Sequence, residues 1–323
     1  MSQANTIEKL IDICIEANEK GLLVEPPPSI LDGFSGNRLV GTIQRFTRYF
    51  SEQGNDSYVE IGVFQGLTLL GNAYANPGTR CFGIDNFSLF NEGGVNKKIV
   101  EQRMEALNIG NAILLDMDFE EGLSKLDEIL SAEQKVGVFF VDGAHDYRSQ
   151  LVPLLRIQQH MAENGVIIVD DANYPHVRQA TADFLQSASD FALLCEAYTP
   201  AHPANLSGEK KAKVLEGWWN GVNVLVHDPE HFIPRDLPPL SPGARDLYFI
   251  THDLFRNRYA ELSWEVLKHI EVCVGSEPGA EEQREKIRQM LEGHQEKYPH
   301  RYDHQNTLSS ALKPFKVALV GRS

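Results

Sequence analysis

The chain has 323 residues, of which 42% are hydrophobic and 23% are charged, an ordinary composition for a globular protein with a full core. Its 45 acidic and 30 basic residues give a formal charge of −15, which disfavours a nucleic-acid partner because a phosphate backbone would be repelled. No apolar run approaches the ~18 residues of a membrane span, and residues 1–21 lack the pattern of a signal peptide. We therefore expect a cytoplasmic protein with no nucleic-acid or membrane partner.

Residues 1–54 precede the first strong strand. Apolar positions recur with roughly helical spacing over residues 6–20, and again over 37–51, where Leu39, Ile43 and Phe46 fall on one stripe. These two predicted helices would cover a site or form a contact between copies of the chain.

Strand-like and helix-like stretches alternate from residue 57 onward. The predicted strands are SYVEIGVF, RCFGIDNF, NAILLDMDF, KVGVFFVDG and NGVIIVDD. The predicted helices that follow them cover residues 66–75, 93–107, 119–131, 147–162 and 175–187. This alternation favours an α/β fold: a doubly wound, Rossmann-like, mostly parallel sheet with helices on both faces.

The pattern changes after residue 188. Residues 190–199 and 220–229 predict two more strands, separated by a polar segment, which would form an antiparallel edge of the sheet. A proline-rich linker follows. Two amphipathic helical stretches (244–270 and 278–296) and the short strand KVALVG complete the chain. We expect three parts: an N-terminal helical lid or dimerisation segment (1–54), an α/β domain (55–229) and a mainly helical extension (230–323).

The carboxyl ends of the strands are the places to look for a site, because ligands of open α/β sheets bind there. The first strand ends in EIGVFQG, with Glu60, Gly62 and Gly66. The glycines allow the backbone to approach a ligand closely, although a tight turn without a ligand is the alternative.

Acids also end the second and third strands. Asp85 lies about 20 residues beyond the glycine turn, where it can bind ribose hydroxyls or cap a helix. Asp116 and Asp118 follow the third strand and either reach a ligand or remain exposed.

The fourth and fifth strands end in VDGAHDY (141–147) and IIVDDANY (167–174). If these strands are neighbours, Asp142, Asp170 and Asp171 converge. Each close pair of anions costs about 1–4 kcal/mol at moderate dielectric, a penalty that a divalent cation removes, and all-oxygen ligation favours Mg²⁺. His145 would be placed to accept a proton near neutral pH.

Structural roles are the alternatives for these residues. Asp142 or the Asp170–Asp171 pair could cap helices, and His145 could bind a backbone group.

Four further expectations concern residues with no assigned chemistry: Asp146 is exposed or a cap; His160 and His176 lie on helix surfaces; Trp218 and Trp219 pack over the sheet edge rather than stack on a flat acceptor; and Thr251-His252-Asp253 begins a helix. The cysteines, far apart in sequence, are expected to be reduced core thiols: Cys14, Cys81, Cys195 and Cys273.

The order of these motifs resembles class I S-adenosylmethionine-dependent methyltransferases: acid-x-Gly-x-x-x-Gly, then Asp85, then the acid after the third strand. VDGAHDY together with NGVIIVDDANY resembles their metal-dependent small-molecule O-methyltransferase branch, which includes enzymes that methylate macrolide sugars. The resemblance covers roughly residues 55–227, as this fold would run.

The resemblance implies a role for each matching residue. S-adenosylmethionine would be bound by Glu60, Gly62, Gly66, Asp85, Asp118 and Asp142. Mg²⁺ or a similar cation would be held by Asp142, Asp170 and Asp171. His145 would be the base, acting with Asp142 in catalysis, and residues 55–229 would be the methyltransferase domain.

The expected function is Mg²⁺-dependent methyl transfer from S-adenosylmethionine to a hydroxyl of a small molecule, such as a sugar or another natural-product acceptor. A homo-oligomer is expected from the family habit and the extra helices. The alternatives are a metal-independent N- or C-methyltransferase and a catalytically inactive cofactor-binding protein of the same fold. An NAD-dependent enzyme is disfavoured because Gly-x-Gly-x-x-Gly is missing.

Overall fold

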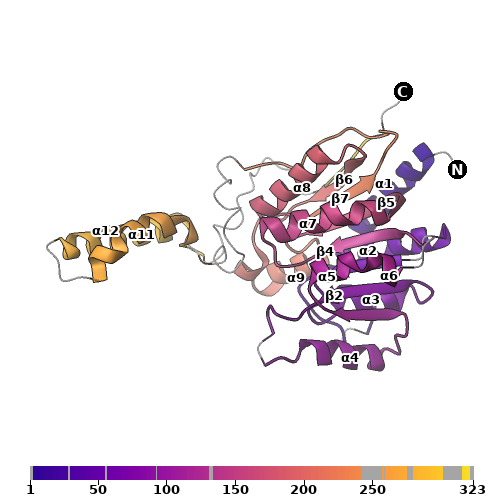
Figure 1. Ribbon diagram of the computed structural model, residues 1–323, viewed down its shortest axis with the longest axis horizontal. Helices are drawn as coiled ribbons and strands as arrows, with labels where there is room; N and C mark the ends of the chain where they lie inside the picture. The colour runs from indigo at the N-terminus through magenta and orange to yellow at the C-terminus, as the bar shows by residue number, and fades with distance from the viewer. Residues whose placement is uncertain are drawn as a thin grey trace.

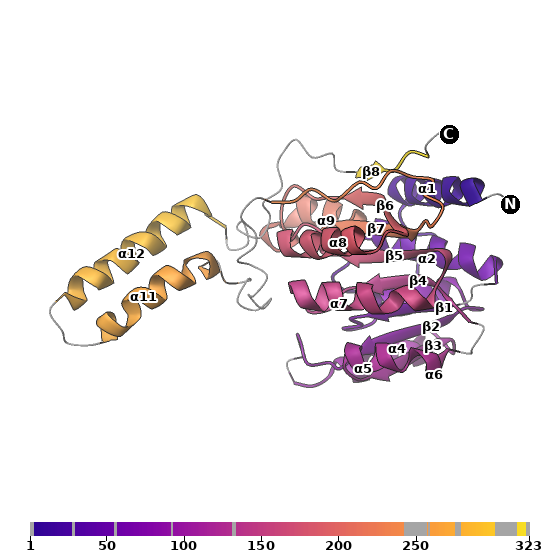
Figure 2. The ribbon, with the colours of Figure 1, turned by 45° about the horizontal axis from the view of Figure 1, so that its top comes forward.

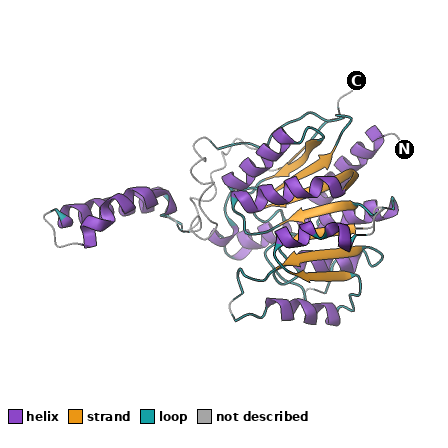
Figure 3. Cartoon of the chain, viewed as in Figure 1, coloured by secondary structure: helices purple, strands orange, loops and turns teal. Residues whose placement is uncertain are grey.

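The computed structural model describes residues 3–27, 30–54, 57–91, 93–130, 134–241, 257, 259–274, 279–300 and 315–320. Within these ranges, strands build one sheet with helices on both faces (Figures 1 and 3). The strands are β1 (Ser57–Ile61), β2 (Arg80–Asp85), β3 (Ala112–Asp116), β4 (Val136–Val141), β5 (Met161–Asp170), β6 (Phe191–Ala197), β7 (Val222–His227) and β8 (Phe315–Val317).

The helices occur in the chain order expected for βαβ units, with additions at both ends. They are α1 (Gln3–Lys20), α2 (Asn37–Glu52), α3 (Leu67–Ala75), α4 (Asn96–Ala106), α5 (Phe119–Ser124), α6 (Leu126–Ile129), α7 (Tyr147–Ile157), α8 (Pro175–Ser187), α9 (Gly208–Glu216), α11 (Ser263–Val274) and α12 (Ala280–Lys297). Short 3₁₀ turns are η1 (Gln158–His160), η2 (Pro203–Asn205) and η4 (Ala260–Leu262).

The sheet order is β3-β2-β1-β4-β5-β7-β6-β8. Strands β1 to β5 pair in parallel, β7 is antiparallel to both β5 and β6, and β8 pairs antiparallel with β6 at the edge. The predicted doubly wound α/β sheet with an antiparallel edge is therefore confirmed. Strand order reverses between β1 and β4, so the crevice that binds ligands in such sheets lies at their carboxyl ends.

Two apolar layers cover the sheet. Along β4, Val138 and Phe140 belong to one layer, whereas Phe139 and Val141 belong to the other, as strand alternation requires. Helices α1 to α4 contribute to the first layer, and α5 to α8 contribute to the second. Burial on both faces explains why the central strands are almost continuously apolar.

The N-terminal helices are part of the first layer. Leu39, Ile43 and Phe46 of α2 are fully buried, as the apolar stripe predicts, and α1 lies against β5, β6 and β8 (Figure 2). Gln44 of α2 links the segment after α1 to helix α3. Its side chain accepts from the backbone amide of Leu23 and donates to the carbonyl of Gly71. Among the described helices, none is long and apolar enough to cross a membrane.

Among the described C-terminal residues, α11 and α12 largely fall within the two stretches predicted to be helical, although α11 continues to Val274, past the predicted end at residue 270. Helices α11 and α12 pack against each other and project from the body as a hairpin (Figures 1 and 2). The predicted linker is anchored to the body because buried Arg178 donates to the carbonyl of Pro239. The Thr251-His252-Asp253 motif lies outside the described residues.

Several sequence-based boundaries were wrong. The helix predicted over 147–162 ends at Ile157, because Met161 already pairs with Val136 in the sheet. The helix predicted over 119–131 is interrupted at Lys125. The polar segment after β6 contains helix α9, which was not predicted. None of its residues is buried, so the sequence lacks the apolar stripe from which a helix is predicted.

Two histidines predicted at the surface are buried. His160 is 7% exposed and His176 is 1% exposed. His176 lies in the first turn of α8, which packs between α7 and β6, so even its polar positions are enclosed. The thiol prediction is confirmed for three cysteines, which are buried and make no disulfide: Cys14, Cys81 and Cys195. Cys273 lies in α11.

Candidate active site

The glycine turn after β1 brings the backbone against the end of β4. Gly62 has a φ of 89°, and a Cβ atom there would lie 1.8 Å from the carbonyl oxygen of Asp142. Gly66 also has a positive φ, 86°, where it caps the N-terminus of α3. Only glycine combines this conformation with so close an approach.

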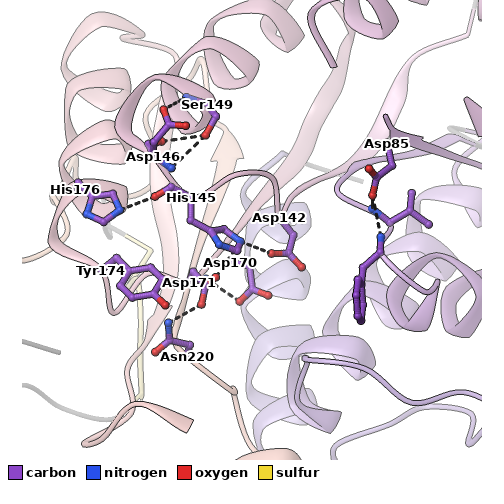
Figure 4. A network of polar contacts seen from close by, with 12 residues as sticks. Asp85, Asp142, His145, Asp146, Ser149, Asp170, Asp171, Tyr174, His176 and Asn220 are labelled. Carbon is purple, nitrogen blue, oxygen red and sulfur yellow. Dashed lines mark hydrogen bonds and ion pairs between the residues drawn. The ribbon is translucent and has the colours of Figure 1, made fainter. Parts of the chain in front are cut away.

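Asp85 fixes the shape of that turn. Its Oδ2 accepts from the amides of Val63 (2.8 Å) and Phe64 (2.9 Å) (Figure 4). Its Oδ1 accepts from the amide of Phe87 (2.6 Å). Asp118 caps α5 by accepting from the amide of Glu120 at 2.8 Å. Both acids line the same cavity, so their capping roles leave the expected cofactor roles open.

Glu60 lies beneath this cavity and is not one of its lining residues. Its side chain is fully buried and accepts from the hydroxyls of Tyr58 (2.5 Å) and Thr68 (3.3 Å). Burial raises the pKa of Glu60 to about 8, despite the opposing effect of the Tyr58 hydrogen bond. Glu60 therefore supports the floor of the site in its protonated form at neutral pH.

Replacing Glu60 with glutamine is expected to flatten the pH dependence of stability. The folded-state pKa of about 8 lies above the ordinary value of 4.5, so the native state retains a proton that the unfolded chain releases. The free energy of unfolding should therefore fall as pH rises through this window, by about a few kcal/mol.

Urea titrations at pH 5 and pH 8 measure this difference directly. Glutamine cannot ionise, so the variant should lose less stability than the wild type between these two pH values. Equal losses would contradict a protonated Glu60.

Three side chains from the ends of β4 and β5 form a cluster (Figure 4). His145 Nε2 lies 2.8 Å from Asp142 Oδ1 and 2.9 Å from Asp171 Oδ2. One ligand atom from each of the three residues lies within 4.8 Å of the others, a spacing that could hold a metal ion. Asn220 Nδ2 donates to Asp171 Oδ1 at 2.5 Å, which orients that carboxylate.

The cluster concentrates negative charge in a poorly solvated place. Burial raises the pKa of Asp142, with His145 opposing the shift, and raises the pKa of Asp170 well above its usual range, with Asp142 and Asp171 adding to the effect. Burial works against the charged form of His145, but the two neighbouring carboxylates outweigh it and raise its pKa well above normal. The site thus favours a cation, either the imidazolium or a metal ion.

The structure separates the two consecutive aspartates. Asp171 lines the cavity, whereas Asp170 is 1% exposed, accepts from the amide of Asp171 at 2.8 Å and does not line the cavity. The group facing the cavity is therefore Asp142, His145 and Asp171, in place of the predicted Asp142, Asp170 and Asp171. Asp146 is the N-cap of α7 and forms a capping box with Ser149, as one of its two predicted roles required.

Five non-glycine residues that line this cavity have left-handed backbones. The φ angles are 50° for Phe64, 49° for Phe90, 55° for His145, 57° for Asp171 and 53° for Trp219. Each such conformation costs about 1–3 kcal/mol and persists only where neighbouring contacts enforce it. Here the carbonyl of His145 is held by buried His176 Nε2, so His176 acts as a support for the cluster.

The cavity has a volume of about 350 Å³ and joins the glycine turn to the acid–histidine cluster. Its lining includes Phe34, which the sequence did not assign to a site, and Trp219, which was expected to pack over the sheet edge. Trp218 packs in the core as expected: it is 3% exposed and stacks on Phe315. Asn220 was also missed, although its place beside two tryptophans before a strand was visible in the sequence.

Residues 59–172 match the family model described as a methyltransferase domain. Among curated proteins, none is similar enough in sequence to count as a match. Similar solved structures include an O-methyltransferase from Bacillus cereus in complex with SAH (12% identity, TM-score 0.43, covering 69% of this chain and 91% of that one). Another is the O-methyltransferase TomG from Streptomyces achromogenes, involved in tomaymycin synthesis, in complex with SAM (15% identity, TM-score 0.41, covering 71% and 99%).

These likenesses are distant, and the substrates of those proteins say nothing about the acceptor of this chain. The family match, in contrast, spans the glycine turn, Asp85, Asp142 and the start of the loop after β5. Its residues build the crevice where the strand order reverses. The segment that builds this crevice is therefore similar to a methyltransferase domain.

Proposed function

We propose that the protein transfers the methyl group of S-adenosylmethionine to a hydroxyl of a small-molecule acceptor, assisted by Mg²⁺ or a similar divalent cation. One observation carries the proposal: the cluster of Asp142, His145 and Asp171 opens into the same cavity as the glycine turn. The acceptor oxygen forms a bond to the methyl carbon as the carbon–sulfur bond breaks. The products are a methyl ether, S-adenosylhomocysteine and a proton.

The donor set fits a divalent cation. Adjacent ligands of an octahedral ion with bonds of about 2.1 Å lie about 3 Å apart, and His145 Nε2 lies 2.8 and 2.9 Å from its two carboxylate neighbours. Two carboxylates and one imidazole suit Mn²⁺ or another first-row ion better than Mg²⁺, which prefers oxygen ligands. When bound, such a cation would favour loss of the proton from the acceptor hydroxyl.

The proposal changes two roles that were expected from the sequence. His145 replaces Asp170 as the third ligand, so it moves from base to metal ligand. Asp170 instead accepts the amide of Asp171 and thereby helps to set the direction of the Asp171 side chain.

The cofactor is proposed to lie along the glycine turn. Gly62 and Gly66 would admit it closely, while Asp85 and Asp118 on the cavity wall would face its ribose and adenine. Transfer depends on aligning oxygen, methyl carbon and sulfur, so a preformed turn held by two amide hydrogen bonds to Asp85 favours the reaction.

The boundaries of the parts remain a proposal as well. Residues 55–229 would carry the reaction, residues 1–54 would cover it and support a homo-oligomer, and residues 230–323 would form the extension. A sugar or another natural product stays the expected acceptor class for this function.

Calorimetric titration of chelator-treated protein tests the proposal. We expect micromolar binding of S-adenosylmethionine, no heat with NAD, and a separate heat with Mg²⁺ or Mn²⁺. Turnover should stop with chelator and return with the cation. Cofactor binding with chelator-resistant turnover would favour a metal-independent N- or C-methyltransferase, and binding with no turnover of any acceptor would favour an inactive relative.

A further inference from the structure

Arg178 of helix α8 is buried although it carries a charge. It is 1% exposed, and in the part of the chain that the structure describes its hydrogen bonds all end on neutral oxygens. Burial lowers the pKa of Arg178 to about 10, with Tyr198 and Glu196 opposing the shift, so the guanidinium stays charged at neutral pH. A buried charge is costly unless hydrogen bonds compensate it, so its acceptors indicate what this residue holds together.

Two of these hydrogen bonds fasten the loop after β5. Arg178 Nη1 donates to the carbonyls of Ala172 (2.8 Å) and Asn173 (2.6 Å), the two residues that directly follow Asp171. Asp171 itself has a left-handed φ of 57°, and its carbonyl accepts from the amide of Tyr174 at 2.9 Å. The chain therefore turns sharply at the residue whose carboxylate faces the cavity, and Arg178 holds this turn from the side of α8.

The other two hydrogen bonds of Arg178 reach the C-terminal extension. Its Nε donates to the carbonyl of Pro239 at 2.7 Å, and its Nη2 donates to Ser241 Oγ at 3.0 Å. These acceptors lie 61 and 63 positions away along the chain. One planar guanidinium thus joins two distant segments, a link that lysine cannot make because its single nitrogen cannot span acceptors on several sides.

The loop after β5 is also held on its opposite side, by the turn before β7. The amides of Ala172 and Asn173 donate to the carbonyls of Gly221 (3.1 Å) and Asn220 (2.9 Å). Their amides are thus fixed by the sheet side and their carbonyls by Arg178. A left-handed backbone such as that of Asp171 persists only where its surroundings enforce it, and these bonds supply that enforcement.

We propose that Arg178 is a positioning residue for the cation site and that residues 239–241 of the C-terminal extension are part of its support. The inference rests on the proposed function. Arg178 does not line the cavity; it acts through the loop, by keeping Asp171 Oδ2 2.9 Å from His145 Nε2. Without this link the loop can relax, which weakens cation binding and leaves the glycine turn at the other end of the cavity unchanged.

Arg178→Lys tests the proposal, with Arg45→Lys as the matched control. Arg45 is also a buried arginine, 6% exposed, and donates to the carbonyls of Gly21 and Gly41 in the N-terminal layer. The dissociation constant of Mn²⁺ is measured by calorimetry on full-length, chelator-treated protein loaded with S-adenosylhomocysteine. We expect Arg178→Lys to weaken Mn²⁺ binding about 10–100-fold, the usual effect of losing a residue that supports a metal ligand, and Arg45→Lys to leave it unchanged.

Two further measurements separate positioning from general structural support. Thermal unfolding shows how far each variant is destabilised, and the affinity for S-adenosylhomocysteine should stay that of the wild type in both. A purely structural role lowers the melting temperature without changing the Mn²⁺ affinity of the folded protein. If Arg178→Lys does not fold, Ser241→Ala decides: it removes one acceptor on the side of the extension and should weaken Mn²⁺ binding about threefold, the effect of one hydrogen bond.

Unchanged Mn²⁺ affinity in the deciding variant, or an equal loss in Arg45→Lys, overturns the inference while the proposed function stands. A wild type that binds S-adenosylhomocysteine but no Mn²⁺ overturns the inference together with the metal dependence of the proposed function.

Discussion

Replacing Asp142 or Asp171 with asparagine is expected to lower methyl transfer by about 10²–10³-fold while cofactor affinity changes little. Each substitution removes one negative charge from the proposed metal site but keeps the size of the side chain. The remaining carboxylate and His145 would hold a divalent cation much more weakly. Turnover at saturating cofactor, together with the heat of Mn²⁺ binding, measures both effects.

Asp146→Asn provides the matched control for this pair. It changes an acid in the same loop, but asparagine can still cap α7 as Asp146 does, so turnover and metal binding should be kept. The proposed metal ligands would be wrong if Asp142→Asn and Asp171→Asn kept the turnover rate of the wild type. They would also be wrong if the variants lost activity but kept the heat of metal binding.

Asp85→Ala is expected to weaken S-adenosylmethionine binding by about 1–3 kcal/mol, the cost of leaving polar groups unpaired. The substitution deprives three backbone amides of their acceptor, those of Val63, Phe64 and Phe87. The glycine turn would then lose its shape as well as its proposed ribose contact. Calorimetry gives the affinity, and thermal unfolding gives the stability of the same variant.

Asp116→Asn is the control for Asp85. Asp116 ends the neighbouring strand β3, is 46% exposed and pairs with Lys97 at the surface, so its loss should change neither affinity nor stability much. A destabilised Asp85→Ala protein with undiminished cofactor affinity would show that Asp85 anchors the turn and does not touch the ligand.

The sequence predicted the parts of the site that follow from local patterns. Alternating apolar runs located the strands. Because these strands are parallel, Glu60, Asp85 and Asp142 lie near the carboxyl ends of three of them, on the same side of the sheet. It could also have been foreseen that Asp170 and Asp171 would not face the same ion, because successive side chains on a strand point to opposite faces.

Other features depend on contacts that are remote in sequence. Phe34 lies in a segment without periodicity. Its place on the wall of the cavity becomes visible only when the fold brings Phe64 and Trp219 beside it. His176 looks like a surface residue on the isolated helix α8, but packing against α7 buries it and directs its ring to the carbonyl of His145. Single-sequence patterns carry no information about such long-range burial.

Three stacked rings on the wall of the cavity, Phe34, Phe64 and Trp219, bear on how an enzyme with the proposed function would change its acceptor in evolution. Two of the three rings, Phe34 and Trp219, come from segments that flank the matched domain. Substitutions there leave Asp85, Gly62 and the chemical groups of the crevice untouched. Gly62, in contrast, contacts the backbone of Asp142 so closely that the cofactor turn and the end of β4 must be inherited together. Natural variation and laboratory selection for new acceptors should therefore accumulate at Phe34 and Trp219, while Asn220, which orients Asp171, is kept together with the reaction.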